Sequence, residues 1–167
     1  MESLTTTDVA RAEIWLCITT LLYFMMNGAQ IFETLVFVPQ WVSSPPQNFK
    51  LLLDGKGVSL KIFWIIFHSV HEIAFILALV FCWKIDPVRN WLLILFIAHI
   101  AVRAWTLIFF APNIIDFQKL AETSVIPENL ASRTSAWQNL NYIRVTIFIA
   151  ISIGLIPLCI KVLNLRS

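Results

Sequence analysis

Charged side chains are scarce in this sequence. Aspartate, glutamate, lysine and arginine make up 13% of the 167 residues, whereas they make up about a quarter of an average soluble domain. Hydrophobic residues make up 59%, and the mean hydropathy is +0.80. So little charge cannot cover a water-exposed surface. The composition therefore excludes an ordinary soluble domain and predicts an integral membrane protein.

A strong net charge and a regular cysteine pattern are also missing. The formal net charge is +2, so the chain has no extended basic field that would attract nucleic acid, and the partner that the composition predicts is the lipid bilayer. Cys17, Cys82 and Cys159 lie in or beside apolar stretches and do not follow the spacing of a metal site. We interpret them as small packing residues.

Four apolar segments dominate the sequence, at roughly residues 13–38, 59–83, 91–111 and 142–163. Each has the roughly 20 residues that cross a bilayer core. Such a segment must be helical, because inside the bilayer it has to satisfy its own backbone hydrogen bonds. The sequence therefore predicts an all-α integral membrane protein. We expect a four-transmembrane-helix bundle with both termini on the same side, in a single domain over residues 1–167.

Two long loops, residues 39–58 and 112–141, are expected to join the spans on the side opposite the termini, which we call the loop side. Prolines and glycines in the first loop predict irregular chain. The middle of the second predicts a short amphipathic helix that ends near Pro127.

The cationic residues in the loops and near the ends of the spans are divided equally between the two sides, so the positive-inside rule ties on count. The terminal side carries Arg11, Lys84, Arg89, Lys161 and Arg166, and the loop side carries Lys50, Lys56, Lys61, Lys119 and Arg133. The terminal-side charges lie in shorter segments and closer to helix ends. We therefore expect the termini of this multi-pass protein in the cytoplasm.

Each span carries a set of polar or interfacial residues. Their spacings of three or four place the members of a set near one another on the helix surface. Charged groups inside a bilayer normally face the bundle interior, where they pair. The residues are Asn27, Gln30 and Glu33 in the first span, His68, His71 and Glu72 in the second, His99, Arg103 and Thr106 in the third, and Trp137, Asn141 and Arg144 at the start of the fourth.

The depth of these residues decides whether they can meet. At 1.5 Å per residue, Gln30 and Arg103 lie about 12 Å from the loop-side ends of their helices, and His68 lies about 15 Å from its own. His99 lies near 17 Å and Glu72 near 20 Å, so the deeper, terminal-side half is almost purely apolar. We therefore predict one polar pocket inside the bundle, closed toward the terminal side and open toward the loop side.

The charges in this pocket balance. Glu33 and Glu72 are matched by Arg103 and Arg144. We expect Glu33 to pair with one of the arginines, and Glu72 with a histidine of its own span or of the third span. Ion pairs that only fix the helix register are the simpler explanation. The number of converging groups favours a functional pocket, because register requires a single polar contact.

A short motif recurs in the chain, as FVPQ in the first span and FAPN in the third. It predicts that both helices end at Phe-x-Pro. When the prolines are aligned, Gln30 matches Arg103 and Glu33 matches Thr106. This match indicates two helical hairpins related by pseudo-symmetry, with a site between them. Chance is the alternative, because proline is common just after a helix.

The third and fourth spans contain the stretches RAWTLIFFAPNIIDFQ and TSAWQNLNYIRV, and the first contains NGAQIFETLVFVPQW. Over its whole length the chain resembles the membrane family of the fungal anthrone oxygenases and their bacterial relatives with the domain of unknown function 1772. The second span lies outside the family pattern. The matching residues are Arg103, Pro112, Asn113, Trp137, Asn141 and Arg144.

The resemblance implies a four-helix membrane oxidoreductase, of the oxygenase type, that acts on a hydrophobic aromatic, polyketide-like or quinone-like molecule. It implies no agreed cofactor. Without a cofactor, such a reaction needs a base to remove a proton and cations to hold the resulting anion. The candidate catalytic residues are His68, His71, Glu72, His99 and Arg103. The candidate substrate-binding residues are Asn27, Gln30, Glu33, Trp64, Trp105, Asn113, Trp137, Asn141 and Arg144.

A metal is an alternative to cofactor-free chemistry. His68, Glu72 and His99 are the candidate ligands of a single zinc or iron ion, with His71 or Glu33 as a fourth, because histidine and carboxylate on facing helices bind such metals. A haem ligated by His99 and a histidine of the second span is a further alternative.

Two other classes of membrane protein can also carry polar residues inside their spans. Histidines beside carboxylates near the membrane midplane also form proton relays in carriers, and a carrier with only four spans would work as a homo-oligomer. An accessory subunit of a larger membrane complex would instead turn polar residues outward on several helices.

Overall fold

The computed structural model describes residues 5–53, 60–123 and 126–165, and these residues form helices and no strand. The predicted all-α class is therefore confirmed. Gly55 and Gly57 of the first connection lie outside the described residues. The elements are α1 (Thr6–Phe32), the π-helix η1 (Glu33–Phe37), α2 (Val38–Val42), the 3-10 helix η2 (Gln47–Leu52), α3 (Lys61–Phe81), α4 (Asp86–Trp105), the π-helix η3 (Thr106–Phe110), α5 (Ala111–Leu120) and α6 (Leu130–Leu163).

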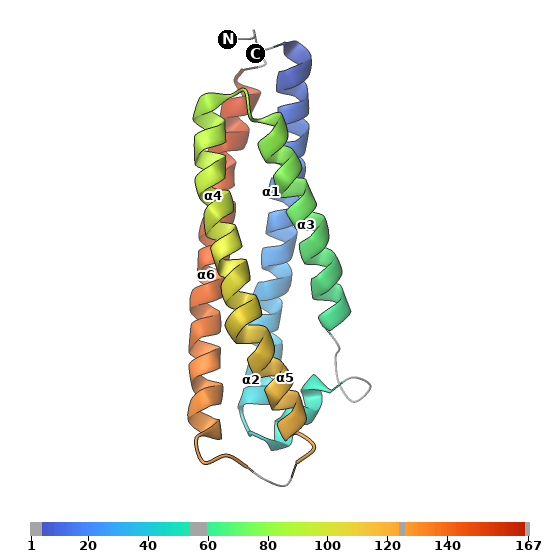
Figure 1. The fold of residues 1–167 in the computed structure, drawn as a ribbon, viewed down its shortest axis with the longest axis vertical. Coiled ribbons are helices and arrows are strands. Elements are labelled where there is room, and N and C mark those ends of the chain that lie inside the picture. Colours follow the sequence, from blue (N-terminus) through green and yellow to red (C-terminus); the bar gives the residue numbers. More distant parts are fainter. Residues whose placement is uncertain (1–4, 54–59, 124–125, 166–167) are drawn as a thin grey trace.

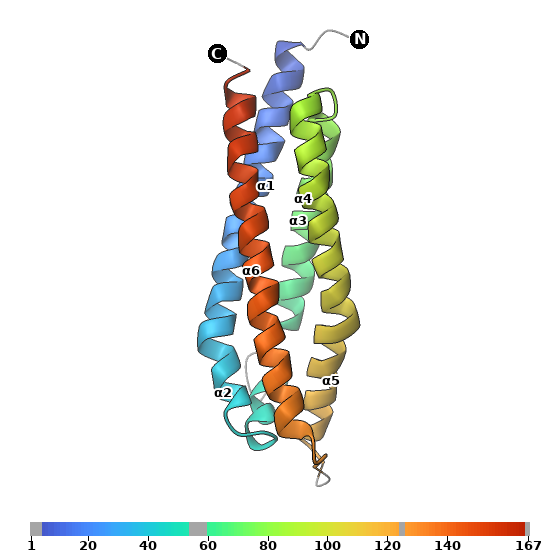
Figure 2. The same cartoon turned by 90° about the vertical axis from the view of Figure 1, so that its left-hand side faces the viewer.

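Four continuous helical stretches are long and apolar enough to cross a membrane: Thr6–Val42, Lys61–Phe81, Asp86–Leu120 and Leu130–Leu163. Each contains or closely matches one predicted span, so the chain is an integral membrane protein. The first turn of α1 and the last turn of α6 lie at the same end of the bundle (Figures 1 and 2).

The predicted loops are much shorter than expected. Within residues 112–141 the chain stays helical to Leu120 and becomes helical again at Leu130, and the chain around Pro127 forms a turn. Within residues 39–58, α2 and η2 are helical. The prediction was wrong because it ended each helix where the apolar run ends. These segments are amphipathic instead, and they bury Phe49, Phe117 and Leu130 against one another.

The helices also do not end at the Phe-x-Pro motifs. Proline lacks the N–H for an α-helical bond and crowds the preceding turn, and a wider π turn is one way for a helix to continue past it. In η1 the N–H of Val38 bonds to the carbonyl of Glu33, and in η3 the N–H of Ala111 bonds to the carbonyl of Thr106. Glu33 and Thr106 are the residues that the proline alignment matches. The two helices therefore change their hydrogen bonding at equivalent positions.

Two clusters of buried residues hold the bundle together. The terminal-side cluster joins α1, α3, α4 and α6, and residues such as Leu16, Tyr23, Phe75 and Leu155 are fully buried in it. The second cluster, which we call the cap, lies at the loop-side end. Its buried aromatic residues come from α2, η2, η3, α5 and α6, and they are Trp41, Phe49, Phe110, Phe117 and Trp137.

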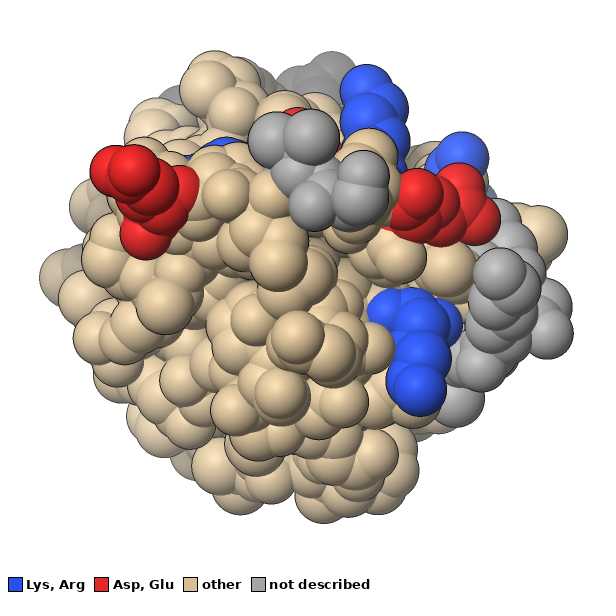
Figure 3. Space-filling model, turned by 90° about the horizontal axis from the view of Figure 1, so that it is seen from below, with Lys and Arg blue, Asp and Glu red and all other residues tan. Residues whose placement is uncertain are grey.

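The loop-side end of the molecule carries scattered acidic and basic side chains, and most of its visible surface is uncharged (Figure 3). Arg133 and Asp116 form an ion pair in this region, with 2.8 Å between Nη2 and Oδ2. No broad field of one sign covers the described part of this face.

Two glycines provide a matched test of the packing. A methyl group at Gly154 of α6 would lie 3.0 Å from Cδ2 of Leu95 on α4, whereas nothing lies within 4 Å of one at Gly28. We predict that Gly154→Leu separates α4 from α6 and lowers the free energy of unfolding by about 1–3 kcal/mol. Gly28→Leu should cause no loss, because the added side chain enters open space. Unfolding in mixed detergent and SDS measures both, and equal losses would contradict this packing.

Candidate functional site

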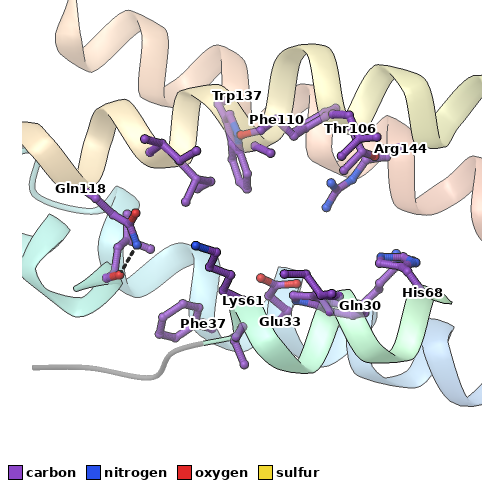
Figure 4. A pocket seen from close by; sticks show the side chains of 18 of the residues that line it. Gln30, Glu33, Phe37, Lys61, His68, Thr106, Phe110, Gln118, Trp137 and Arg144 are labelled. Carbon is purple, nitrogen blue, oxygen red and sulfur yellow. Dashed lines mark hydrogen bonds between the residues drawn. The ribbon is translucent and has the colours of Figure 1, made fainter. Parts of the chain in front are cut away.

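A cavity of about 430 Å³ lies in the loop-side half of the bundle, and we call it the central cavity. One wall comes from α1, η1 and α3, and the other from α4, η3, α5 and α6 (Figure 4). Among the predicted site residues, those that line it are Gln30, Glu33, Trp64, His68, Arg103, Trp137 and Arg144.

Three of these residues have buried polar atoms without a hydrogen-bond partner among the described residues. They are Oε1 of Gln30, Nδ1 of His68 and Nε of Arg144. An unpartnered buried polar atom costs about 1–3 kcal/mol, so such atoms are rare unless something else binds them. Gln30 and His68 lie on one side of the cavity and Arg144 on the other (Figure 4). The three residues thus surround the cavity with polar groups that the described residues leave without a hydrogen-bond partner.

Arg144 is held in place by several groups at once. Its Nη2 donates a hydrogen bond to Oδ1 of Asn141 at 2.6 Å, and its guanidinium lies 4.3 Å from the ring centre of Phe110. Asn141 in turn donates to Oγ1 of Thr34 at 3.0 Å. Of the two arginines, Arg144 is the one whose charge interacts with Glu33. The guanidinium is therefore fixed in the cavity wall while its Nε stays free.

Aromatic rings form much of the remaining wall. Trp64 stacks on the imidazole of His68, with 5.3 Å between ring centres and an interplanar angle of 28°. The indole of Trp137 donates a hydrogen bond of 3.3 Å to the carbonyl of Phe110, at the end of η3. These flat faces suit a planar aromatic ligand.

The loop-side end of the central cavity lies under the cap. Trp41 and Leu52 line that end, and Gln118 of α5 donates a hydrogen bond of 2.6 Å to the carbonyl of Leu52 across it (Figure 4). Cap residues therefore line the end of the cavity where the sequence predicts an opening. The prediction treated the connections as loops, whereas they fold into helices over the cavity.

A second hollow of about 410 Å³ lies between α3 and α4, and we call it the lateral groove. It shares three residues with the central cavity, namely His68, Arg103 and Leu107. The others that line it are Ser69, Glu72, Ile100 and Ala104.

A chain of polar contacts crosses the bundle beside the groove. The hydroxyl of Tyr23 lies 2.9 Å from Nδ1 of His99, and Nε2 of His99 lies 3.2 Å from Oε2 of Glu72. The same carboxylate oxygen is 3.9 Å from Nε of Arg103. The contact between Glu72 and His99 is one of the expected pairings. This chain ties α1, α3 and α4 together.

Tyr23 is a site residue that the sequence analysis missed. It is fully buried, and it precedes Asn27 by one helical turn on α1. That spacing continues the polar set of the first span and was the available signal. Lys61, Gln118 and Trp41 also line the central cavity and were missed, because the first was treated as a loop-side charge and the other two as parts of loops.

Several predicted site residues line neither hollow. Asn27 donates to Oγ of Ser152 at 2.8 Å, so it links α1 to α6. Trp105 packs edge-on against Phe110 at 5.1 Å. Within this group, Asn113 and Asn141 make hydrogen bonds to their neighbours, and His71 and His99 are fully buried.

His71 is excluded from direct contact with a ligand in either hollow. It is 0% exposed, neither of its ring nitrogens has a hydrogen-bond partner among the described residues, and it packs edge-on against Tyr23 at 4.5 Å. The prediction of a catalytic role for His71 assumed that it shares the accessible face of His68. The ring instead lies inside the terminal-side cluster.

The predicted metal ligands do not form a metal site. In the part of the chain that the structure describes, no three His, Cys, Asp or Glu side chains are grouped to hold a metal ion. Both ring nitrogens of His99 are already within hydrogen-bond distance of Tyr23 and Glu72. The described residues therefore do not group His68, Glu72 and His99 as the ligands of one metal ion.

Glu72 provides a test of the polar chain. We predict that Glu72→Gln lowers the free energy of unfolding by roughly 2–3 kcal/mol, because Arg103 loses its anionic partner inside the membrane; the partial exposure of Glu72 keeps this below the cost at a fully buried pair. Unfolding in mixed detergent and SDS measures the change.

The matched control for Glu72 is Asp116→Asn. This substitution breaks the ion pair between Asp116 and Arg133. Their side chains are 47% and 33% exposed, so the free energy of unfolding should change by less than about 1 kcal/mol. A loss at Glu72 no larger than that at Asp116 would show that the polar chain does not hold the helices together.

No family model matches the chain, and neither a curated protein nor a solved structure matches it. The resemblance to the anthrone oxygenases therefore stays a prediction, and the function rests on the geometry of the central cavity and the lateral groove.

Proposed function

We propose that the protein is a membrane-embedded oxidoreductase of the oxygenase type, which oxidises a hydrophobic aromatic, polyketide-like or quinone-like molecule in the central cavity. One observation carries this proposal. The unpartnered atoms of Gln30, His68 and Arg144 all belong to residues that line one largely apolar cavity. Their burial favours a ligand that is flat and apolar over most of its surface and bears oxygen atoms.

The groups around the cavity suit the removal of a proton. His68 lines the cavity, and its Nδ1 has no partner among the described residues, so its imidazole is the candidate to accept a proton from an acidic C–H or phenol. The guanidinium groups of Arg144 and Arg103 also line the cavity, and in a dry site they stabilise the resulting oxyanion strongly. Trp64 stacks on His68 and limits the orientations of its ring.

The proposed reaction uses dioxygen as the oxidant. An activated CH₂ group and one O₂ give a carbonyl group and one water molecule, and four electrons pass from carbon to oxygen. His68 removes the first proton from carbon, which lets the carbanion react with dioxygen, and the arginines hold the negative charge on the substrate oxygen. The protons released from the CH₂ group end in the water molecule.

We also propose an orientation and an assembly state. The termini lie in the cytoplasm, so the central cavity lies in the half of the membrane that is farther from the cytoplasm. A homo-oligomer is compatible with this arrangement. Reaction of single cysteines introduced at Thr7 and Gln47, which are both exposed, with a membrane-impermeant thiol reagent on intact cells, in a background without the native cysteines, tests the orientation.

A carrier for the same class of molecule is the second candidate. It is favoured by the π-helices η1 and η3, which change the helical hydrogen bonding at equivalent positions beside the cavity. Interrupted helices in two repeats are features of many carriers. Proton-coupled flux into liposomes, without chemical change of the transported molecule, would favour this candidate over the oxidoreductase.

His68 provides the direct test of catalysis. We predict that His68→Gln lowers the turnover of 1,8-dihydroxyanthrone in proteoliposomes by about 10²- to 10⁴-fold, because glutamine keeps a polar side chain but cannot act as a base. The absorbance of the anthraquinone product measures the rate. The control is Ile66→Ala on the same helix, since Ile66 is 59% exposed and lines neither hollow. Full turnover by a folded His68→Gln protein would contradict the proposal that His68 is the base of this reaction.

Arg144 tests the stabilisation of the anion. Lysine keeps the charge but lacks the planar group that bonds to Asn141 and stacks on Phe110. We therefore predict that Arg144→Lys lowers kcat by about 10- to 10³-fold, with a smaller change in KM. Arg133→Lys is the matched control, because Arg133 contacts Asp116 outside the cavity and should leave both constants unchanged. A change in KM alone would assign Arg144 to substrate binding and not to the reaction.

A further inference from the structure

We propose that the substrate reaches the central cavity sideways from the hydrocarbon layer of the membrane, through the lateral groove between α3 and α4. This inference rests on the proposed function and deepens it. It assigns the substrate to lipophilic molecules that dissolve in the bilayer, and it gives the lateral groove the role of a passage.

The two hollows meet along one line of residues. His68, Arg103 and Leu107 line both the central cavity and the lateral groove. Leu107 is 62% exposed on the outer surface of the bundle, whereas His68 is 8% exposed. A path through the groove therefore runs from the lipid-facing surface, past Leu107 and Arg103, to the candidate base.

The α3–α4 contact is the weakest between neighbouring long helices. α1 packs closely against both α3 and α6, and α4 packs closely against α6, but α3 and α4 touch over only a short stretch. Ser69 and Ala104 face the groove with small, exposed side chains. The hydroxyl of Ser69 donates to the carbonyl of Ile65 in its own helix and does not bridge to α4.

Packed side chains block the two routes along the axis of the bundle. The terminal-side cluster fills the bundle beyond His99, where Tyr23, Phe75 and Phe148 are at most 1% exposed. At the loop-side end, Trp41 and Phe117 of the cap are at most 1% exposed. On its lipid-facing side the central cavity is lined by the exposed residues Ile65, Leu107 and Ile115, and the lateral groove adjoins it there at Leu107.

The chemistry of the groove fits the passage of an amphiphilic aromatic molecule. Ile100, Ala104 and Leu107 give it an apolar rim. Arg103 lies where the two hollows join, and its one contact with an acidic group among the described residues is the 3.9 Å approach to Glu72. Its remaining N–H donors can bind an oxygen atom of the passing molecule and hand it on to Arg144. A ligand without such an oxygen would gain nothing from this arrangement.

The experiment measures the binding of 1,8-dihydroxyanthraquinone to the protein in phosphatidylcholine proteoliposomes, by stopped-flow quenching of tryptophan fluorescence. Ala104→Phe fills the groove from α4, and Ser69→Phe fills it from α3 if the first variant does not fold. The matched control is Ala101→Phe, because Ala101 is also exposed on α4 but lines neither hollow.

A blocked passage alters the kinetics of binding and not the equilibrium. We expect Ala104→Phe to lower both the association and the dissociation rate constants by about tenfold or more, with Kd unchanged, while Ala101→Phe behaves as the wild type. Unchanged rate constants in the groove variants would overturn the passage. So would a raised Kd with an unchanged association rate, since the groove would then be part of the binding site. Wild-type protein that does not bind the probe would instead overturn the proposed function.

Discussion

The charge of Glu72 is the constraint on which the rest of the structure depends. A carboxylate in an apolar helix is costly unless it is paired, and this one is paired with His99 and Arg103 of α4. His99 is in turn held by Tyr23 of α1. Three helices are thus tied at one depth. On the terminal side of this tie the bundle is filled by packed side chains, and on the loop side α3 and α4 leave room for the central cavity and the lateral groove. The polar chain therefore sets the inner limit of the site.

The two prolines shape the site from the other end. Pro39 and Pro112 would break an ordinary helix, but a π turn before each lets the helix continue. The continued segments, α2 and α5, fold over the cavity and contribute to the cap. Because each π turn adds one residue to a turn of helix, it also changes the direction of the side chains that follow. The recurring Phe-x-Pro motif thus marks the positions where the helices pass from the membrane-spanning bundle into the cap.

The membrane spans could be predicted from the sequence more completely than the site. Apolar length predicted four spans, since a bilayer imposes it, and depth predicted the contact between Glu72 and His99. Depth could not show which polar residues face a cavity, because it does not give the direction in which each side chain points. Asn27 was therefore placed in the pocket, although it bonds to Ser152 of α6. Tyr23 was missed although it lies one helical turn before Asn27, because only amide and acidic side chains were counted in the polar set of the first span. The ends of the helices were wrong wherever an amphipathic segment, such as residues 130–141, continued an apolar one.

The three histidines show how access determines the chemistry that a residue can perform. His99 has both ring nitrogens in hydrogen-bond contacts, so it holds the structure. His71 has neither nitrogen in a hydrogen bond with the described residues, but it is sealed among aromatic rings and cannot meet a ligand in either hollow. His68 combines an unpartnered nitrogen with a place in the walls of both hollows. It is thus the histidine that can exchange a proton with a molecule arriving from the membrane. In the proposed function, a base at the junction of the lateral groove and the arginine-lined cavity would act on a substrate as it leaves the bilayer, and such a reaction would require a membrane protein and not a soluble enzyme.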